Sequence, residues 1–300
     1  MKPGRPARFL LIGRRGQVGW ELRRSLLPYG EVEARSSDEL NLLDQSAVRE
    51  AVRAFRPDAI INAAAYTAVD RAESERDVCR ALNSLAPGVL AEEAERLGAW
   101  VVHYSTDYVF NGKKESPWTE EDEPDPVNYY GESKLAGDLA IARSSRKHLI
   151  FRTSWVYSSR GSNFLLTMLR LFAAKGSVRV VNDQIGAPTW ARFIAQVTLI
   201  ALREAMDRGD AGVSGLYNLA SSGRASWYDF AREIRSCAGD ACGGVSISPD
   251  SSEEYPTPAR RPARSVHSTE KIERAFGIRP PDWRDAARLC MDGIGEGKDK

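Results

Sequence analysis

A tyrosine and a lysine four residues apart, Tyr130 and Lys134, form the pair whose types and spacing could do proton chemistry. They lie in the segment NYYGESK (128–134), which is typical of a helix start, and four residues are about one helical turn, so both side chains project from one face. The cation favours ionisation of the phenol, which makes Tyr130 a usable proton donor or acceptor. A lone pair of this kind is more often a solvated helix face, so the hypothesis needs a cofactor site and a third catalytic group.

A glycine-rich turn near the N-terminus could supply the cofactor site. Gly13, Gly16 and Gly19 lie between an apolar run (9–12) and a helical pattern (20–27), which is the layout of a dinucleotide-binding turn. The first glycine permits the tight turn, the second lets the backbone approach a pyrophosphate at the helix N-terminus, and the third allows close helix packing. The alternative is a glycine-rich turn that binds no ligand.

The end of the expected second strand (31–35) is where nicotinamide cofactors are usually discriminated. Arg35, Ser36 and Ser37 follow there instead of an acidic residue. An arginine with two hydroxyls suits a 2′-phosphate better than a free ribose, so the sequence favours NADPH, with NADH possible. Arg35 could equally be a solvated charge. The next helix is expected over 46–55, with Asp44 or Ser46 as its N-cap.

Small and polar residues end two further buried strands. The strand at 57–65 ends in three alanines, which leave room for a ligand across the sheet edge. The strand at 100–105 runs into Thr106 and Asp107, whose side chains would point into the same crevice. Thr106 could donate to a substrate carbonyl oxygen and Asp107 could accept from substrate hydroxyls. Alternatively, Thr106 caps the turn and Asp107 closes an Asx-turn.

Buried strands alternate with helices through the first half of the chain, which predicts an α/β fold with a Rossmann-type, doubly wound parallel sheet. We expect residues 1–160 to form mainly the NAD(P)-binding domain and residues 161–300 mainly a smaller C-terminal α/β substrate-binding lobe. Some later segments should return to the first domain, but we assign the short strand at 215–219 to the smaller lobe, because pieces this short do not suggest a continuation of the sheet.

Composition narrows the class of protein. The chain has 42 basic and 41 acidic side chains, and no block of one sign suggests a nucleic-acid or membrane surface. Its four cysteines contain no CxxC pair and its three histidines are scattered, so no metal site is predicted. No apolar run is long enough to span a bilayer. We expect a soluble cytoplasmic protein.

The loop at 255–264 holds three arginines that could bind a phosphorylated substrate or be solvated.

The glycine turn, the strand ending in Thr106 and the Tyr130–Lys134 pair occur in the order found in the extended short-chain dehydrogenase/reductase superfamily, which the chain resembles. Within it, the chain is similar to the dTDP-4-dehydrorhamnose reductase family. The segments that carry this resemblance span nearly the whole chain: GRRGQVGWEL (13–22), NAAAYTAVD (62–70), HYSTDYVFNG (103–112), YYGESKLAG (129–137), RTSWVY (152–157), NDQIGAPT (182–189) and YPTPARRP (255–262).

The resemblance implies NAD(P)H-dependent reduction of the 4-keto group of dTDP-4-dehydro-β-L-rhamnose. It also implies that the smaller C-terminal lobe binds the sugar nucleotide. Tyr130 would be the proton donor, Lys134 would bind the nicotinamide ribose and lower the phenol pKa, and Thr106 would complete the triad. Thr106, Asp107 and Trp155 would contact the sugar. The implied cofactor-binding residues are Gly13, Gly16, Gln17, Val18, Gly19, Arg35, Ser36, Asn41, Leu42, Ala63, Ala64, Ala65, Tyr66, Thr67, Tyr130 and Lys134.

The sequence departs from the family at a few positions. Some relatives have acidic residues where this chain has Ser36 and Asn41, which puts strict use of NAD in doubt. Some relatives dimerise around a metal held by carboxylates, and this chain keeps Glu21 but has Arg192 where a second ligand would align, so we expect a monomer or weak homodimer without metal. Two alternatives stay open: a 4-ketoreductase for another nucleotide-activated deoxysugar, and a non-catalytic dinucleotide-binding regulatory subunit. The intact triad argues against the second.

Overall fold

A six-stranded parallel sheet organises the computed structural model, which describes residues 5–209, 212–239 and 244–295. The strand order is β10-β5-β4-β3-β1-β2, and every neighbouring pair is parallel. The order reverses between β1 and β3, so the crevice for a ligand opens at the carboxyl ends of these strands. The predicted Rossmann-type sheet is confirmed. Its strands are β1 Ala7–Ile12, β2 Gly30–Arg35, β3 Ala59–Asn62, β4 Trp100–Thr106, β5 His148–Thr153 and β10 Gly215–Asn218.

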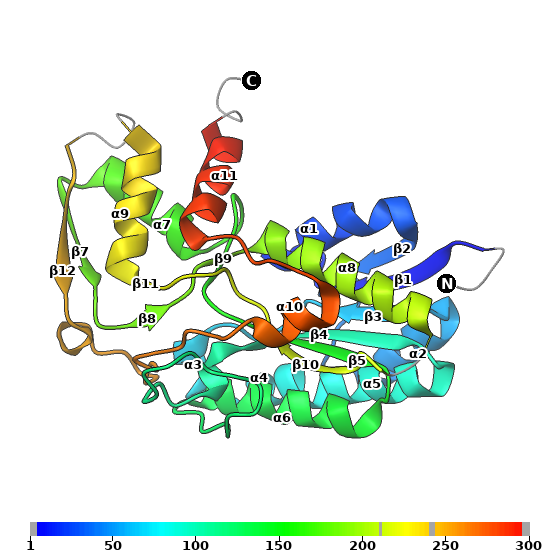
Figure 1. Ribbon diagram of the computed structural model, residues 1–300. Coiled ribbons are helices and arrows are strands. Elements are labelled where there is room, and N and C mark those ends of the chain that lie inside the picture. Colours follow the sequence, from blue (N-terminus) through cyan, green and yellow to red (C-terminus); the bar gives the residue numbers. More distant parts are fainter. Residues whose placement is uncertain (1–4, 210–211, 240–243, 296–300) are drawn as a thin grey trace.

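Helices cover both faces of this sheet (Figure 1). Successive residues of one strand point to opposite faces: Leu11 packs with Leu22 of α1, and Leu10 packs in the other core with Val52 of α2. Because both faces are buried, the central strands β1, β3 and β4 are largely apolar runs. One face carries α1 Gln17–Leu26, α8 Ala191–Arg208 and α10 Glu270–Phe276, and the other carries α2 Gln45–Phe55, α5 Ala86–Leu97 and α6 Tyr129–Ser144. Asp44 is the N-cap of α2.

The assignment of the strand at 215–219 to the smaller lobe was wrong. β10 lies at the edge of the main sheet, where Gly215 pairs with Leu149 and Asn218 pairs with Arg152 of β5. Helix α8, which precedes β10, packs along α1 and brings the chain back to this edge. A strand of four residues suffices there, because an edge strand has a neighbour on one side only. The boundary at residue 160 between a cofactor domain and a substrate domain stays a prediction.

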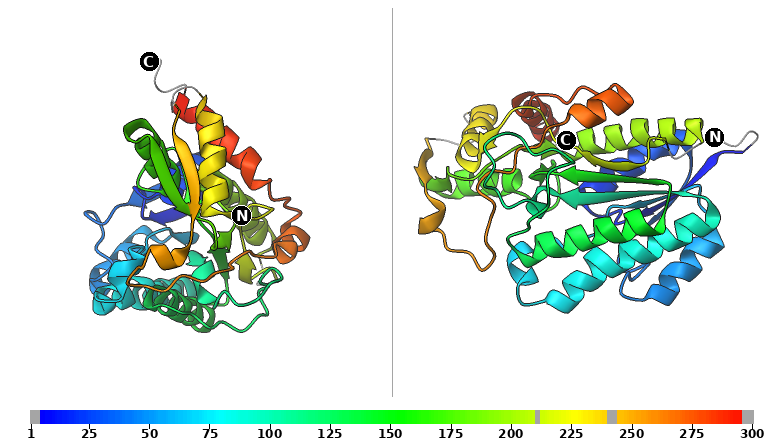
Figure 2. Two further views of the ribbon diagram at one scale, coloured as in Figure 1. Left: turned by 90° about the vertical axis from the view of Figure 1, so that its left-hand side faces the viewer. Right: turned by 60° about the horizontal axis from the view of Figure 1, so that its bottom comes forward.

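A smaller group of helices and strands packs beside the carboxyl ends of the sheet (Figure 1). Its core contains Tyr157, Phe230 and Trp283, and β12 lies beside α9 (Figure 2). The elements are α7 Phe164–Ala174, α9 Trp227–Ala238, α11 Trp283–Gly295 and the parallel pair β7 Ser177–Val181 with β12 Ser246–Asp250. The two-residue pairs β6 Val156–Tyr157 with β9 Thr189–Trp190, and β8 Ile185–Gly186 with β11 Ala225–Ser226, join this group to the rest.

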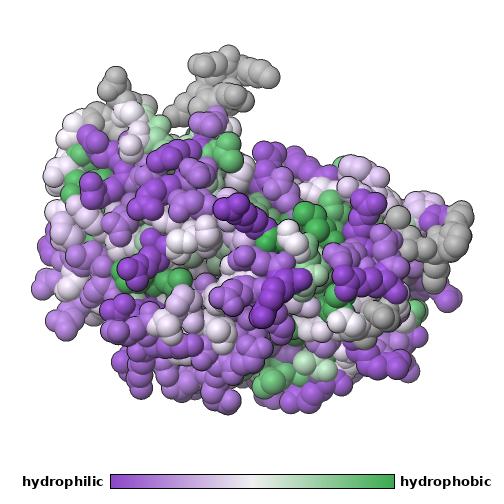
Figure 3. Space-filling model, viewed as in Figure 1, coloured by the Kyte–Doolittle hydropathy of each residue, from purple (hydrophilic) through white to green (hydrophobic). Residues whose placement is uncertain are grey.

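The outer surface offers no membrane-spanning element in the part of the chain that the structure describes. None of its helices combines the length and the apolar character that a membrane crossing needs. The face shown in Figure 3 is mostly hydrophilic, with apolar side chains gathered in small patches.

Helix α6 carries Tyr130 and Lys134, and glycines set its distance from its neighbours. Asn128 caps its start by accepting from the Gly131 N–H at 2.8 Å. The helix packs on the π-helical turn Ala81–Leu85, which connects the short helix α4 Arg76–Arg80 to α5; another short helix, α3 Val69–Ala72, precedes α4. A Cβ at Gly137 would lie 2.1 Å from the carbonyl oxygen of Asn83 in that turn. The helix can therefore reach its place only with glycine at position 137.

We expect Gly137→Ala to lower the free energy of unfolding by about 1–3 kcal/mol, because the added methyl group would overlap the Asn83 carbonyl and push two packed elements apart. Gly88→Ala on α5 is the matched control, since a Cβ there would meet only the Ala140 side chain, at 3.4 Å. That variant should be neutral or slightly stabilising through helix propensity. Urea unfolding followed by circular dichroism measures both, and equal losses would contradict the role of Gly137.

Candidate active site

A pocket of about 590 Å³ opens at the carboxyl ends of β1, β3 and β4. The turn after β1, the loop after β3 and the start of α6 line it, so the predicted glycine turn and the Tyr130–Lys134 pair share one cavity. Of the residues expected to bind the cofactor, the pocket brings together Gly13, Gly16, Gln17, Val18, Ser36, Asn41, Leu42, Ala63, Ala64, Ala65, Thr67, Tyr130 and Lys134.

The glycine turn has the geometry that a pyrophosphate needs. Gly13 has a φ of 89°, and a Cβ there would lie 2.7 Å from the carbonyl carbon of Ala63. Gly19 does not line the pocket; a Cβ there would lie 2.1 Å from the Gly13 carbonyl oxygen, so it lets α1 pack against the turn. Gly16 at the N-cap provides no side-chain cap, and the first turn of α1 has no acidic residue. The positive end of the helix therefore faces the pocket, and these residues fit a dinucleotide.

Arg35 lies outside the pocket wall. Its guanidinium group pairs with Glu33 at 2.8 Å, because residues two apart on a strand share one side. Ser36 does line the pocket, but its hydroxyl donates to Glu39 at 2.8 Å. The pocket wall instead contains Arg15, which the sequence analysis did not name.

Tyr66, another expected cofactor residue, is also absent from the pocket wall. Its hydroxyl donates to Glu75 at 2.6 Å. Its backbone N–H and carbonyl bind the side chain of Asn83, which is fully buried and also donates to Ser133 on α6 at 3.0 Å. Asn83 therefore joins the loop after β3 to α6, a role that the sequence analysis did not assign.

Tyr130 is enclosed beside Thr106. Burial raises the pKa of the phenol above its ordinary value, and a hydrogen bond with the Thr106 hydroxyl opposes this increase. The phenol therefore keeps its proton at neutral pH, as a general acid must. Thr106 also accepts from the Tyr108 N–H at 3.2 Å and caps the short 3-10 helix Asp107–Val109. The predicted capping role is thus confirmed, and it coexists with contact to the phenol.

Asp107 is buried among hydroxyl groups. One carboxylate oxygen accepts from Thr106 at 3.1 Å and the other accepts from Ser154 at 3.0 Å. Burial raises the pKa of Asp107 to about 6, while hydrogen bonds from Ser265, Ser154 and Thr106 lower it. Protein groups thus bind both oxygens, and the contact with a sugar hydroxyl stays a prediction.

Trp155 lies at the break between β5 and β6 in a strained conformation. Its φ is 46°, a left-handed value that costs a non-glycine residue of order 1 kcal/mol or more. Its ring stacks on Trp227 with centroids 3.5 Å apart, and Gly186 makes room for it, since a Cβ there would lie 2.5 Å from the ring. Such a conformation persists only where the surroundings hold it, which is typical of ligand-binding positions.

Lys134 is buried and contacts a histidine that the sequence analysis did not name. Its Nζ lies 2.9 Å from Nε2 of His103 on β4. Burial lowers the pKa of Lys134 to about 8, and the nearby Asp138 opposes this change. No motif marks a histidine inside an apolar strand, so only the packing of β4 against α6 could have revealed this contact.

Glu21 and Arg261, two charged residues that the sequence analysis considered for metal or phosphate binding, are paired with other protein groups. Among the described residues, no group of three or more His, Cys, Asp and Glu side chains could hold a metal ion; Cys242 lies outside these residues. Glu21 instead lies 3.5 Å from Arg192. In the loop at 255–264, Arg261 pairs with Asp70 at 2.9 Å and Arg264 lines a separate hollow. Phosphate binding by this loop therefore stays a prediction.

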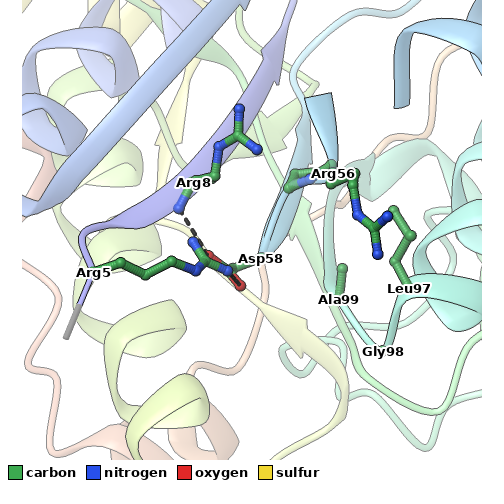
Figure 4. A pocket seen from close by; sticks show the side chains of 8 residues that line it. Arg5, Arg8, Arg56, Asp58, Leu97, Gly98 and Ala99 are labelled. Atoms are coloured by element: carbon green, nitrogen blue, oxygen red, sulfur yellow. Dashed lines mark hydrogen bonds and ion pairs between the residues drawn. The ribbon is translucent and has the colours of Figure 1, made fainter. Parts of the chain in front are cut away.

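A hollow of about 340 Å³ lies at the amino ends of β1 and β4, at the other end of these strands from the larger pocket. Figure 4 shows the side chains that line it. Arg5, Arg8 and Arg56 line it, but Arg5 forms a two-point pair with Asp58, and Arg8 pairs with Glu31. No acid-base pair comparable with Tyr130 and Lys134 lies in its wall, so we place the chemistry in the larger pocket.

Comparison with known proteins identifies the family. Residues 7–295 match the model of the family described as RmlD substrate binding domain. A dTDP-4-dehydrorhamnose reductase of Burkholderia thailandensis is 48% identical over 291 residues, which cover 95% of this chain and 98% of the relative.

Two solved structures are similar over nearly the whole chain. A dTDP-4-dehydrorhamnose reductase from Clostridium acetobutylicum has a TM-score of 0.90 at 34% identity and covers 96% of this chain and 99% of its own. One from Bacillus anthracis, in complex with NADP, has a TM-score of 0.87 at 32% identity with the same coverage. Sequence and fold thus agree from end to end, and the chain belongs to the dTDP-4-dehydrorhamnose reductase family.

Proposed function

We propose that this protein reduces the 4-keto group of dTDP-4-dehydro-β-L-rhamnose with NADPH to give dTDP-β-L-rhamnose. The observation that carries the proposal is the single pocket shared by the glycine turn, Tyr130 and Lys134. Relatives named for this reaction match nearly the whole chain, and one of them has been crystallised with NADP.

The positions of the residues support the following roles. A bound nicotinamide would supply a hydride to carbon 4 of the sugar. The turn at Gly13 and Gly16 and the start of α1 would hold the pyrophosphate. Tyr130, whose raised pKa keeps it protonated, would give its proton to the emerging alkoxide. Thr106 would bind the same oxygen, and Lys134 would bind the nicotinamide ribose.

The sugar itself would lie toward the smaller lobe. Asp107 and Trp155 follow the ends of β4 and β5, beyond the catalytic tyrosine, and would contact the sugar ring. We further propose a monomer or weak homodimer without a bridging metal. The Glu21–Arg192 ion pair supports this, because it occupies the carboxylate that would serve as a ligand.

Tyr130→Phe should lower the turnover number by about 10²- to 10⁴-fold, since the proton donor is lost while the ring remains. The dissociation constant of NADPH, measured by fluorescence titration, should change less than about twofold, because the ring still fills its place in the pocket wall. Tyr157→Phe is the matched control: this tyrosine lies in the core of the smaller lobe, and its hydroxyl has no hydrogen-bond partner among the described residues.

The same assay separates the alternatives. Wild-type turnover in Tyr130→Phe would refute the chemistry. Turnover of a different nucleotide-linked ketosugar, tested in a panel, would reassign the substrate. Binding of NADPH without its oxidation by any ketosugar would indicate a regulatory subunit.

Arg15→Ala should raise the KM for NADPH by about tenfold and leave the KM for NADH almost unchanged, because a charged hydrogen bond to the 2′-phosphate would be lost. Arg15 and Ser37 both line the pocket, where Arg15 pairs with Asp38, whereas Arg35 pairs with Glu33 outside the pocket. Arg35→Ala is therefore the control and should change neither constant. The reverse pattern in steady-state kinetics would restore the original assignment to Arg35.

A further inference from the structure

A chain of three polar groups runs from the backbone of the pocket to Lys134. The Ala64 N–H donates to Oδ1 of Asn62 at 3.2 Å, and Nδ2 of Asn62 lies 3.2 Å from Nδ1 of His103. Nε2 of His103 lies 2.9 Å from Nζ of Lys134. The register of the sheet places Asn62 of β3 directly opposite His103 of β4, and both side chains are buried.

The direction of this chain is fixed at its backbone end. Oδ1 of Asn62 accepts from the Ala64 N–H, so the amide group turns its NH₂ toward the histidine. Burial holds the pKa of His103 well below its usual range, and Lys134 lowers it further when it is charged, so in either case the ring is neutral and carries one proton. Because Nδ1 accepts from Asn62, that proton is on Nε2.

The Nε2 proton of His103 therefore points at Nζ of Lys134. An unprotonated amine can accept this hydrogen bond with its lone pair, whereas an ammonium group would place two donors against each other. If the Asn62 amide were turned over, its NH₂ group would face the Ala64 N–H. Two donors would then oppose each other there instead of at Lys134. The chain thus favours the amine form of Lys134, in addition to the effect of burial.

The other ionisable groups facing Lys134 oppose this preference weakly. Asp138, one turn further along α6, favours the ammonium form, but it also lies 3.5 Å from Arg152 and shares its charge with that residue. Burial raises the pKa of both Cys79 on α4 and Tyr130 on α6, so these two groups are neutral near pH 7.

We propose that His103, held by Asn62, is a positioning residue that makes Lys134 a proton-exchanging group near neutral pH. A lysine with an ordinary environment would instead be a permanent cation there. The sequence motif identifies Lys134 only as a charge near the phenol, so this role comes from the buried contacts on its other side.

The consequence for catalysis rests on the proposed function. Each reduction leaves the Tyr130 oxygen as a phenolate after its proton has passed to the alkoxide. The Lys134 ammonium group, which lines the same pocket, would supply the proton that restores the phenol and would itself become a neutral amine. The amine takes up a proton from solvent before the next turnover. A lysine that releases its proton readily supports this cycle.

The test is a pH titration of the free protein labelled with ¹³C at lysine Cε, whose chemical shift reports protonation; Lys134→Met identifies the signal. Lys134 should titrate at about pH 8 in the wild type. In His103→Gln, the amide oxygen can accept from an ammonium group, so the midpoint should rise by at least about one pH unit, which is about tenfold tighter proton binding. His148→Gln, at the half-buried start of β5, is the matched control and should leave the midpoint unchanged.

An equal midpoint in the wild type and His103→Gln, or a wild-type midpoint near the ordinary value of about 10.4, would overturn the inference. Should His103→Gln fail to fold, Asn62→Asp tests the same point, because its carboxylate would draw the ring proton to Nδ1 and leave Nε2 as an acceptor for the ammonium group. The titration needs neither cofactor nor ketosugar. Lack of ketosugar reduction would therefore count against the proposed function and leave this result standing.

Discussion

Close packing of α6 against its neighbours is the constraint on which the site depends. Two glycines on this helix flank Lys134: a Cβ at Gly131 would lie 2.1 Å from the Tyr108 carbonyl oxygen, and one at Gly137 equally close to that of Asn83. Any larger residue would push the helix away from the 3-10 helix that contains Tyr108 or from the π-helical turn that contains Asn83. The phenol and the amine would then no longer reach the carboxyl ends of β1 and β3. Within a few residues, the helix therefore carries both the Tyr130–Lys134 pair and the glycines that let it pack closely against its neighbours.

This placement buries charge, and the neighbouring residues offset part of the cost. Lys134, Asp138 and Arg152 are all nearly inaccessible to solvent. Asp138 accepts from Ser105 at 2.7 Å, lies 3.5 Å from Arg152, and also favours the ammonium form of Lys134. Buried ion pairs contribute little net stability, because desolvation cancels most of the attraction. Their presence at the pocket is better explained by the need to hold an ionisable lysine in a dry, fixed position.

The sequence was sufficient wherever function depends on the backbone. The glycine turn and the strand ends could be predicted because glycine spacing and apolar runs report backbone geometry directly. Side-chain direction was harder: Arg35 follows the expected pattern for a 2′-phosphate, yet it lies on the same side of β2 as Glu33 and pairs with it. Contacts between elements could not be predicted from the sequence, since His103 meets Asn62 only through the register of β3 and β4. The edge strand β10 was assigned to the wrong part of the fold because a four-residue run is too short to indicate which strand it pairs with.

The position of Trp155, which we propose contacts the sugar, depends on the smaller lobe through a series of aromatic contacts. Trp155 stacks on Trp227, Trp227 packs against Phe164, and Phe164 stacks on Phe230, which meets Trp283 edge to face. The strained φ of Trp155 is held from this side, so the packing of α7, α9 and α11 determines where its ring lies. The glycine turn and Lys134 lie on elements of the main sheet and its helices. Changes in the smaller-lobe core can therefore shift Trp155 while the pocket around the glycine turn and Lys134 stays intact, so under the proposed roles substrate choice would be physically separate from hydride chemistry.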